Sequence, residues 1–439
     1  MSGSPTAIAM LGLMLVLMAL RIPVAAAMFI PGVLGFAWIA GPESLLSALK
    51  GTTMARLSVY ELSIIPLFLL MGQLAVKGGL SKALFDAAAA FVGHLKGGLG
   101  FAAILACAVF GSVCGSSVAT TATITQVAYP EMKRHGYSGR LATATLATGG
   151  TLGILIPPSV PLVIYAILAE QNIAKLFVAS IVPALIAIAG YLLVLAVVQR
   201  GGNPSRPPAK ATGQQKCNAL IQVMPILIIF LVVFCGIYLG AFTPTEGAAI
   251  GAIGMLIAGL ARKSLTLQNL LGAVLSTAET TAMIFFIFLG ADVMNSGLAL
   301  TQLPATLATW VAGMNVSGLW VLVAILAFYL VLSAVMDELS MIMLTIPVLF
   351  PALMGLDLWG LDAQDKAIWF GILVLMVVQF GLIAPPIGLN VIIVNSLARD
   401  VPITDTYRGV LPFLASDFVR IILLLLFPSL SLWLVGWLD

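Results

Sequence analysis

Apolar segments long enough to cross a membrane recur along the whole chain, separated by short polar or glycine- and proline-rich stretches. About 20 consecutive apolar residues span a bilayer as a helix. The pattern predicts two spans, an interfacial stretch with a third span, a connecting segment, a hairpin, a broken helix and a final span. In the first half these elements are expected at about 5–20, 23–40, 42–77, 78–97, 98–131, 140–170 and 176–198.

The second half repeats this order. Its elements are expected at 219–240, 243–261, 264–297, 298–316, 317–354, 366–398 and 413–437. A polar, Pro/Gly-rich and basic stretch at 201–217 separates the halves and is typical of a solvated linker. We therefore divide the chain into a first repeat at 1–200, with scaffold spans at 1–77, and a second at 218–439, with scaffold spans at 219–297. An odd number of spans in each half would invert the second repeat relative to the first.

Each half interrupts its apolar hairpin with polar residues and then breaks a helix with two prolines. The first interruption is Gly111-Ser-Val-Cys-Gly-Ser-Ser117 and the second is Val335-Met-Asp-Glu-Leu-Ser340. The proline pairs are Pro157-Pro158 and Pro385-Pro386. In lipid, broken helices are tolerated only where they are buried in protein or line a cavity, and two of them in matching positions mark a transport site near the midplane.

The composition agrees with this all-α, polytopic membrane fold. Apolar residues make up 61% of the chain and charged residues 8%, against about 25% charged in a soluble protein. The cysteines form no Cys-x-x-Cys pair, so no metal centre is expected. Sequence patterns of zinc proteases, serine hydrolases and phosphate-binding loops are missing, which argues against an enzyme and against an ATP-driven pump.

Basic residues give the orientation, because cytoplasmic loops carry most of them. With the 201–217 linker in the cytoplasm, all but four of the 20 Lys and Arg residues fall on that side, Arg206 and Arg420 among them. The four left outside are Lys50, Arg56, Lys175 and Lys366. The first hairpin then enters from the cytoplasm and the second from outside.

The two hairpin tips carry candidate ligands for a cation and an anion. At the first tip, Ser116, Ser117 and Thr120 supply hydroxyl groups beside a helix start, whose free N–H groups and positive dipole end attract anions. The second tip carries Asp337, Glu338 and Ser340; a carboxylate inside a membrane is costly and should have a partner. The alternatives are a small-residue packing surface at the first tip and a solvated carboxylate tip at the second.

The helix breaks add backbone groups, because proline lacks an N–H and frees the carbonyl one turn earlier. The candidates around the breaks are Gly153, Pro157, Pro158, Ser159, Pro385, Pro386, Gly388 and Asn390. A structural kink is the alternative at each break. Thr243-Pro-Thr-Glu246 has the pattern of a capping box at the start of a helix.

An ordered set of motifs carries a resemblance to a known family. The motifs are Gly-Ser-Ser-x-Ala-Thr120, Pro130-Glu-Met132, Gly136-Tyr137, Gly153-x-Leu-Ile-Pro-Pro-Ser159, Thr243-Pro-Thr-Glu246, Met336-Asp337 followed by Pro347 and Pro351, and Pro385-Pro386-x-Gly388-x-Asn390. In this order they resemble the large membrane (M) subunit of tripartite ATP-independent periplasmic (TRAP) transporters, over essentially the whole chain. Single motifs are weak, and their ordered set is strong.

The resemblance implies an elevator-type symporter in the bacterial inner membrane, driven by Na⁺ and carrying an organic anion, a carboxylate or a sulfonate. It implies a separate four-helix Q subunit and a periplasmic substrate-binding protein. For Na⁺ it points to Ser116, Ser117, Gly153, Asp337, Ser340 and Gly388. Glu338 departs from the family pattern, in which a small polar residue follows the Asp. The main alternative is a stand-alone Na⁺ symporter of the divalent-anion type, which would transport without a binding protein.

Overall fold

The computed structural model describes residues 3–201, 207–313, 316–333 and 336–437, and these residues form helices and loops without strands. This confirms the predicted all-α fold. Val335 of the second interruption, Arg206 and residues 202–206 of the linker lie outside the described residues. The first half contains α1 (Gly3–Ala19), α2 (Val24–Ala40), α3 (Pro42–Leu57), η1 (Tyr60–Ser63), α4 (Ile64–Lys77), α5 (Leu80–Val92), α6 (Gly98–Cys114), α7 (Ser117–Arg134), α8 (Gly139–Leu155), α9 (Val160–Leu168) and α10 (Ile173–Gly201).

The second half follows the same order of helices. It contains α11 (Gly213–Tyr238), α12 (Pro244–Ala261), α13 (Leu267–Leu300), α14 (Leu303–Gly313), α15 (Gly318–Ser333), α16 (Glu338–Met354), α17 (Ala363–Gly381), α18 (Leu389–Leu397), α19 (Ile403–Leu426), α20 (Ser429–Leu432) and η2 (Val435–Trp437). The helix starts follow their sequence signals. Thr243 caps α12 and forms the predicted capping box with Glu246.

Among the described residues, seven helices are long and apolar enough to cross a membrane. The pair α8 and α9, bent by 40° at the Pro157-Pro158 break, makes an eighth if it counts as one span. The hairpin helices α6, α15 and α16 are apolar but shorter. The chain is therefore a multi-pass membrane protein.

Two segments differ from the expected pattern. In the first half, the interfacial helix α3 and the span α4 are separated at Ser58–Val59, whereas α13 runs unbroken for 34 residues. Pro66 lacks the N–H that would bond to Leu62, in the short 3-10 helix η1 that precedes α4, and α13 contains no proline.

The final helix begins ten residues earlier than the expected span at 413–437. Helix α19 covers Ile403–Leu426, between Pro402 at its N-cap and Pro428 just beyond its end. Arg420 lies well inside this helix and is only 3% exposed. It was counted among the cytoplasmic basic residues, and its burial among the helices does not fit a solvated cytoplasmic position.

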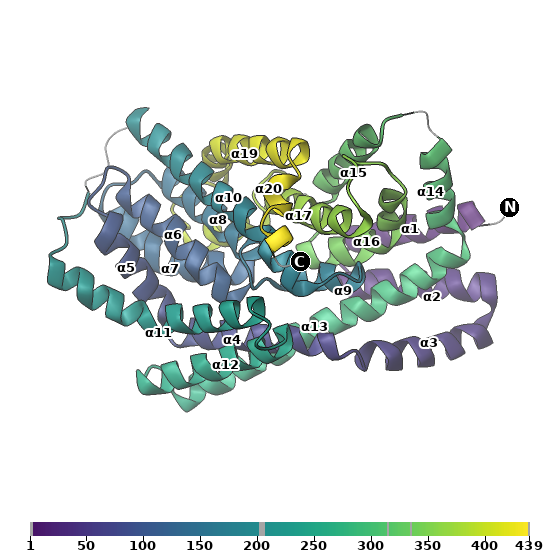
Figure 1. Cartoon of the computed structure of the whole chain (residues 1–439), viewed down its shortest axis with the longest axis horizontal. Coiled ribbons are helices and arrows are strands. Elements are labelled where there is room, and N and C mark those ends of the chain that lie inside the picture. The colour runs from purple at the N-terminus through teal and green to yellow at the C-terminus, as the bar shows by residue number, and fades with distance from the viewer. Residues whose placement is uncertain (1–2, 202–206, 314–315, 334–335, 438–439) are drawn as a thin grey trace.

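The helices divide into a long layer and two hairpin units. In Figure 1, α4, α12, α13, α2 and α3 lie along the lower long side of the molecule. The hairpin α6–α7 lies on one side above this layer and α15–α16 on the other, with α8, α10 and α17 between them. The hairpins and broken helices thus sit against the layer formed by the scaffold spans.

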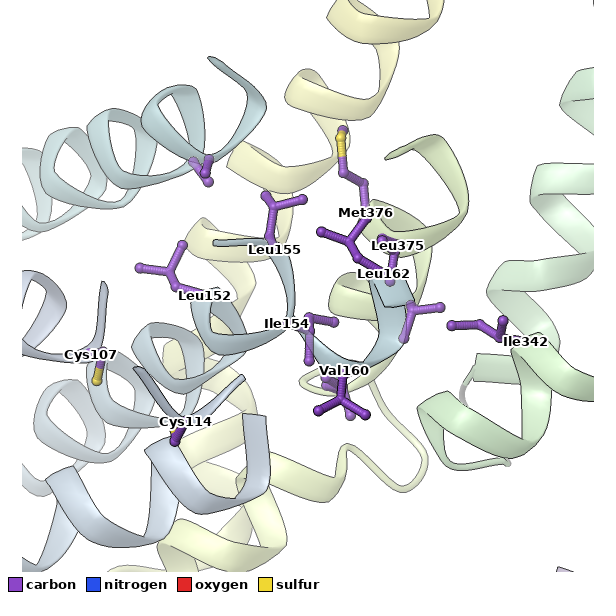
Figure 2. Packing of buried hydrophobic residues seen from close by; sticks show 14 of the residues in the cluster. Cys107, Cys114, Leu152, Ile154, Leu155, Val160, Leu162, Ile342, Leu375 and Met376 are labelled. Carbon is purple, nitrogen blue, oxygen red and sulfur yellow. The ribbon is translucent and has the colours of Figure 1, made fainter. Parts of the chain in front are cut away.

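The first broken helix lies at the centre of the packing between the hairpins. Figure 2 shows Ile154 and Val160, on either side of the break, between Cys107 and Cys114 of α6 and Ile342 of α16. These side chains are buried, and α9 packs against α16 while α8 packs against α6. Each hairpin therefore contacts a part of the same broken helix.

Candidate functional site

Both hairpin tips are built as the start of a helix. Helix α6 ends at Cys114, and Gly115 turns the chain in the left-handed region (φ +59°), where a side chain would be strained. Ser116 then caps α7, its Oγ accepting from the N–H of Ala119. At the second tip Asp337 caps α16, its Oδ2 accepting from the N–H of Ser340 at 3.1 Å.

The two tips meet directly. Ser117, the first residue of α7, donates from its Oγ to Oε2 of Glu338, the first residue of α16, at 2.9 Å. Both side chains are buried, and Glu338 makes no ion pair with any described residue. Glu338 is therefore bound across the tips and does not project freely into solvent. Glu338 joins the two halves.

A cavity of about 640 Å³ opens beside the joined tips. From the tips it is lined by Cys114, Gly115, Ser116, Asp337, Glu338 and Ser340, among others. Its other wall comes from the scaffold, with Pro23 and Val24 at the start of α2, Gln73 on α4, and Thr280 on α13. The cavity therefore lies between the hairpin tips and the scaffold layer.

The charges around the cavity come from helix ends and carboxylates. Residues in the first turn of α7, α9, α16 and α18 contribute to its lining, and among the described residues no Lys, Arg or His does. Each helix start carries a partial positive charge of about half a unit. Four such ends favour a negatively charged group, while Asp337 and Glu338 favour a cation, so the lining suits both.

One polar group at the cavity lacks a partner. Ser340 is fully buried, and its Oγ makes no hydrogen bond to any described residue. Burying an unpartnered hydroxyl is unfavourable. An oxygen left free next to Asp337 is the kind of ligand that a hard monovalent cation takes.

The first break packs onto the first tip. The Pro157-Pro158 bond is cis. Ser159 caps α9 by accepting from the N–H of Leu162, and its hydroxyl donates to the carbonyl of Ile154 in α8 at 2.5 Å. Gly153 lies so close to this tip that a Cβ would be 2.8 Å from both the Ser116 carbonyl oxygen and Thr120 Oγ1. Thr120 Oγ1 also lies 3.0 Å from Cys114 Sγ.

The residues that follow the second break contact both the cavity and α8. After the cis Pro385-Pro386 bond, Gly388 turns in the left-handed region (φ +52°). Leu389 reaches the cavity, whereas Asn390 is buried, donates to the Ala147 carbonyl of α8 at 3.2 Å and leaves its Oδ1 without a partner.

Of the predicted site residues, Ser116, Asp337 and Ser340 line the cavity. The others are not among its lining residues and lie near the tip contact or the breaks; they are Ser117, Thr120, Gly153, Pro157, Pro158, Ser159, Pro385, Pro386, Gly388 and Asn390. The sequence analysis missed Gln73 and Thr280, and their only signal is that they are polar residues within apolar spans.

Comparison with known proteins settles the family. Residues 11–430 match the family described as "Tripartite ATP-independent periplasmic transporter, DctM component". The chain belongs to this family. Its curated relatives are named as transporter permeases, not as enzymes. The predicted resemblance to TRAP large subunits is confirmed.

Several relatives cover nearly the whole length. The C4-dicarboxylate TRAP transporter large permease protein DctM of Pseudomonas aeruginosa is 34% identical over 87% of each chain. The ectoine TRAP transporter large permease protein TeaC of Halomonas elongata is 30% identical over 97% of each. The sialic acid TRAP transporter permease protein SiaT of Haemophilus influenzae is 28% identical over 98% of this chain and 68% of its own.

A solved structure shows a similar fold. The YdaH transporter of Alcanivorax borkumensis superposes with a TM-score of 0.59 over 88% of each chain, at 15% sequence identity. At this identity the likeness concerns the fold alone.

Proposed function

We propose that this TRAP large subunit carries a small organic anion across the bacterial inner membrane in symport with Na⁺. The observation that supports this most is the cavity beside which the two hairpin tips meet, facing the scaffold spans. An intramembrane cavity lined by helix starts and carboxylates can hold an anion and its coupling cation together.

Na⁺ binds at the tips and the adjacent breaks, with oxygen ligands drawn from Ser116, Gly153, Asp337, Ser340 and Gly388. The unpartnered, fully buried Ser340 Oγ supports this assignment, as does the position of Asp337 in the cavity lining. Na⁺ then neutralises carboxylate charge that would otherwise repel the solute.

The solute carries a carboxylate or a sulfonate. Relatives are named for C4-dicarboxylates, sialic acid and ectoine, which all contain a carboxylate group. The four helix starts at the lining attract this group, and no basic side chain of the described residues lines the cavity to take that role.

Transport follows an elevator mechanism. The two hairpins, the two broken helices and the final spans α10 and α19 move as one body, and the remaining spans of each half form the fixed frame. The location of the cavity between tips and scaffold supports this division. Each net charge that crosses with the body contributes about 2.3 kcal/mol per 100 mV.

Two partner proteins complete the transporter: a separate small membrane subunit of four helices (Q) and a periplasmic substrate-binding protein (P). The family description as one component of a tripartite periplasmic transporter supports this. Large apolar side chains remain exposed on the scaffold, such as Ile221 and Leu231 on α11 and Ile253 on α12, where lipid and the Q subunit would contact the frame.

Uptake into proteoliposomes tests the proposal. With Q, the binding protein and a labelled carboxylate solute, uptake should require an inward Na⁺ gradient. Ser340→Ala should raise the Na⁺ concentration needed for half-maximal uptake, whereas Ser396→Ala, on the exposed side of α18, should not change it. Na⁺-independent uptake by the wild-type complex would contradict the proposal, and transport by this chain alone would favour a stand-alone symporter of the divalent-anion type.

A further inference from the structure

A second polar cluster lies inside the helical body, away from the cavity. It consists of Thr151 on α8, Tyr191 on α10, Gln379 on α17, and Asp417 and Arg420 on α19. All five side chains are at most 3% exposed, and none lines the cavity. Ionisable residues inside a membrane protein are costly and call for an explanation in terms of function.

Gln379 is the centre of this cluster. Its Nε2 donates to Thr151 Oγ1 at 2.9 Å and to Tyr191 OH at 3.0 Å, and its Oε1 accepts from Arg420 Nη2 at 3.0 Å. The Tyr191 hydroxyl donates onward to Asp417 Oδ2 at 3.0 Å. The same Arg420 Nη2 lies 2.8 Å from Asp417 Oδ1, and the guanidinium stacks over the Tyr191 ring.

The cluster joins matching positions of the two halves. Thr151 lies six residues before Pro157, and Gln379 lies six residues before Pro385. Helices α10 and α19, which supply the other members, are the last long helices of their halves. The Thr151–Gln379 hydrogen bond therefore fixes one broken helix against the other at the same distance from each break.

Two residues closer to each break, a glycine contacts the neighbouring hairpin. Gly153 lies against Ser116 and Thr120 of the first tip, and a Cβ on Gly381 would be 2.1 Å from Ser333 Oγ at the end of α15. A shift of α8 relative to α17 would therefore move the two tips relative to each other. Because the tips share one cavity, such a shift would also change its ligand geometry.

We propose that Gln379 is a positioning residue: through Thr151, Tyr191 and the Asp417–Arg420 pair it sets the relative placement of the two broken helices and so of the two hairpin tips. This inference rests on the proposed function for its effect on Na⁺. A buried ion pair adds little net stability over apolar residues of the same volume, so stability alone gives no reason for these polar groups.

The uptake test uses the complete transporter with Q and the binding protein. Gln379→Leu removes all three hydrogen bonds at similar volume, and Thr151→Val removes one acceptor. Thr145→Val is the matched control, because Thr145 is equally buried on α8 but its hydroxyl bonds to Leu141 of the same helix.

We expect the Na⁺ concentration for half-maximal uptake to rise about three- to tenfold in Gln379→Leu, with the maximal rate per folded protein kept. Thr151→Val should show part of the shift, and Thr151→Ser and Thr145→Val should resemble the wild type.

A distance measurement tests the same inference without Na⁺ coupling. Spin labels at Gln126→Cys on α7 and Ile392→Cys on α18, both exposed, report the placement of the first hairpin against the second broken helix; exposed Cys217 and Cys235 are first replaced by Ser. Gln379→Leu should shift or broaden the distance distribution, and Thr145→Val should not.

The outcomes separate the two proposals. An unchanged distance distribution in Gln379→Leu overturns the positioning role, as does a loss of maximal rate with no change in Na⁺ dependence. Na⁺-independent uptake by the wild type overturns the proposed symport, and the label distances still decide the positioning role.

Discussion

Ser117→Ala should weaken the contact between the hairpin tips by more than the loss of an ordinary hydrogen bond. The substitution leaves the Glu338 carboxylate buried without its Ser117 donor, and Glu338 makes no ion pair with any described residue. Hydrogen bonds to charged groups contribute about 1.5–3 kcal/mol. We therefore expect Ser117→Ala to lower the free energy of unfolding by about 1.5–3 kcal/mol, whereas Glu338→Gln, which removes the charge, should cost about 0.5–1.5 kcal/mol.

A double-mutant cycle in mixed detergent micelles, followed by tryptophan fluorescence, measures this coupling. Replacing both partners by apolar groups, as in Ser117→Ala with Glu338→Leu, should recover much of the loss, because no buried polar group is then left unpaired. Ser112→Ala is the control, since Ser112 is buried near the same tip but bonds only within α6. Additivity within about 0.3–0.5 kcal/mol would refute the reasoning, because residues in contact should couple more strongly.

Three further substitutions test other contacts. Gly153→Ala should lower the free energy of unfolding by about 1–3 kcal/mol and slow uptake, because its Cβ would press on the Ser116 carbonyl; Gly12→Ala, with open space around it, should do neither. Arg56→Ala should cost about 1–3 kcal/mol in the same unfolding assay, because Asp292 loses a bidentate partner at 2.5 and 2.6 Å; a double variant that also replaces Asp292 by Ala should recover part of this. Asp400 lies in the loop after α18, where the hydrogen bond from Lys133 and then that from Tyr129 lower the pKa of its carboxyl group below 3.8. The stabilisation by this group is therefore complete above pH 3.8 and lost as the pH falls through the lowered pKa, so unfolding midpoints of wild type and Asp400→Asn should differ at neutral pH and converge in acid.

The helices, the hairpins and the breaks were predictable because their signals are local. A proline pair, a polar interruption in an apolar run and a capping box act within a few residues of their own position. The Thr243–Glu246 capping box is present as predicted for this reason. The same locality made Ser116, Asp337 and Ser340 good candidates, since each belongs to the first turn of a helix or its cap.

Contacts between the halves were not predictable from such signals. The sequence analysis noted Glu338 as a departure from the family pattern and, in one alternative, as a solvated tip. The hydrogen bond from Ser117 was not predicted, because no local signal indicates that Ser117 lies opposite Glu338. Arg420 was counted with the cytoplasmic residues because the start of the last helix was set ten residues too late, so that Arg420 came close to that start. Its spacing of three residues from Asp417 could have indicated an ion pair on one helix face.

The two halves match in the order of their helices, yet the residues that join them differ at matching positions. Ser117 and Glu338 are each the first residue of the second hairpin helix, and Thr151 and Gln379 each precede a proline pair by six residues. In both pairs one partner donates to the other across the halves. At the tips, two facing glutamates would repel each other, whereas a serine hydroxyl can donate to a glutamate carboxylate. The different residues at these matching positions therefore supply a donor on one half and an acceptor on the other, which joins the two halves.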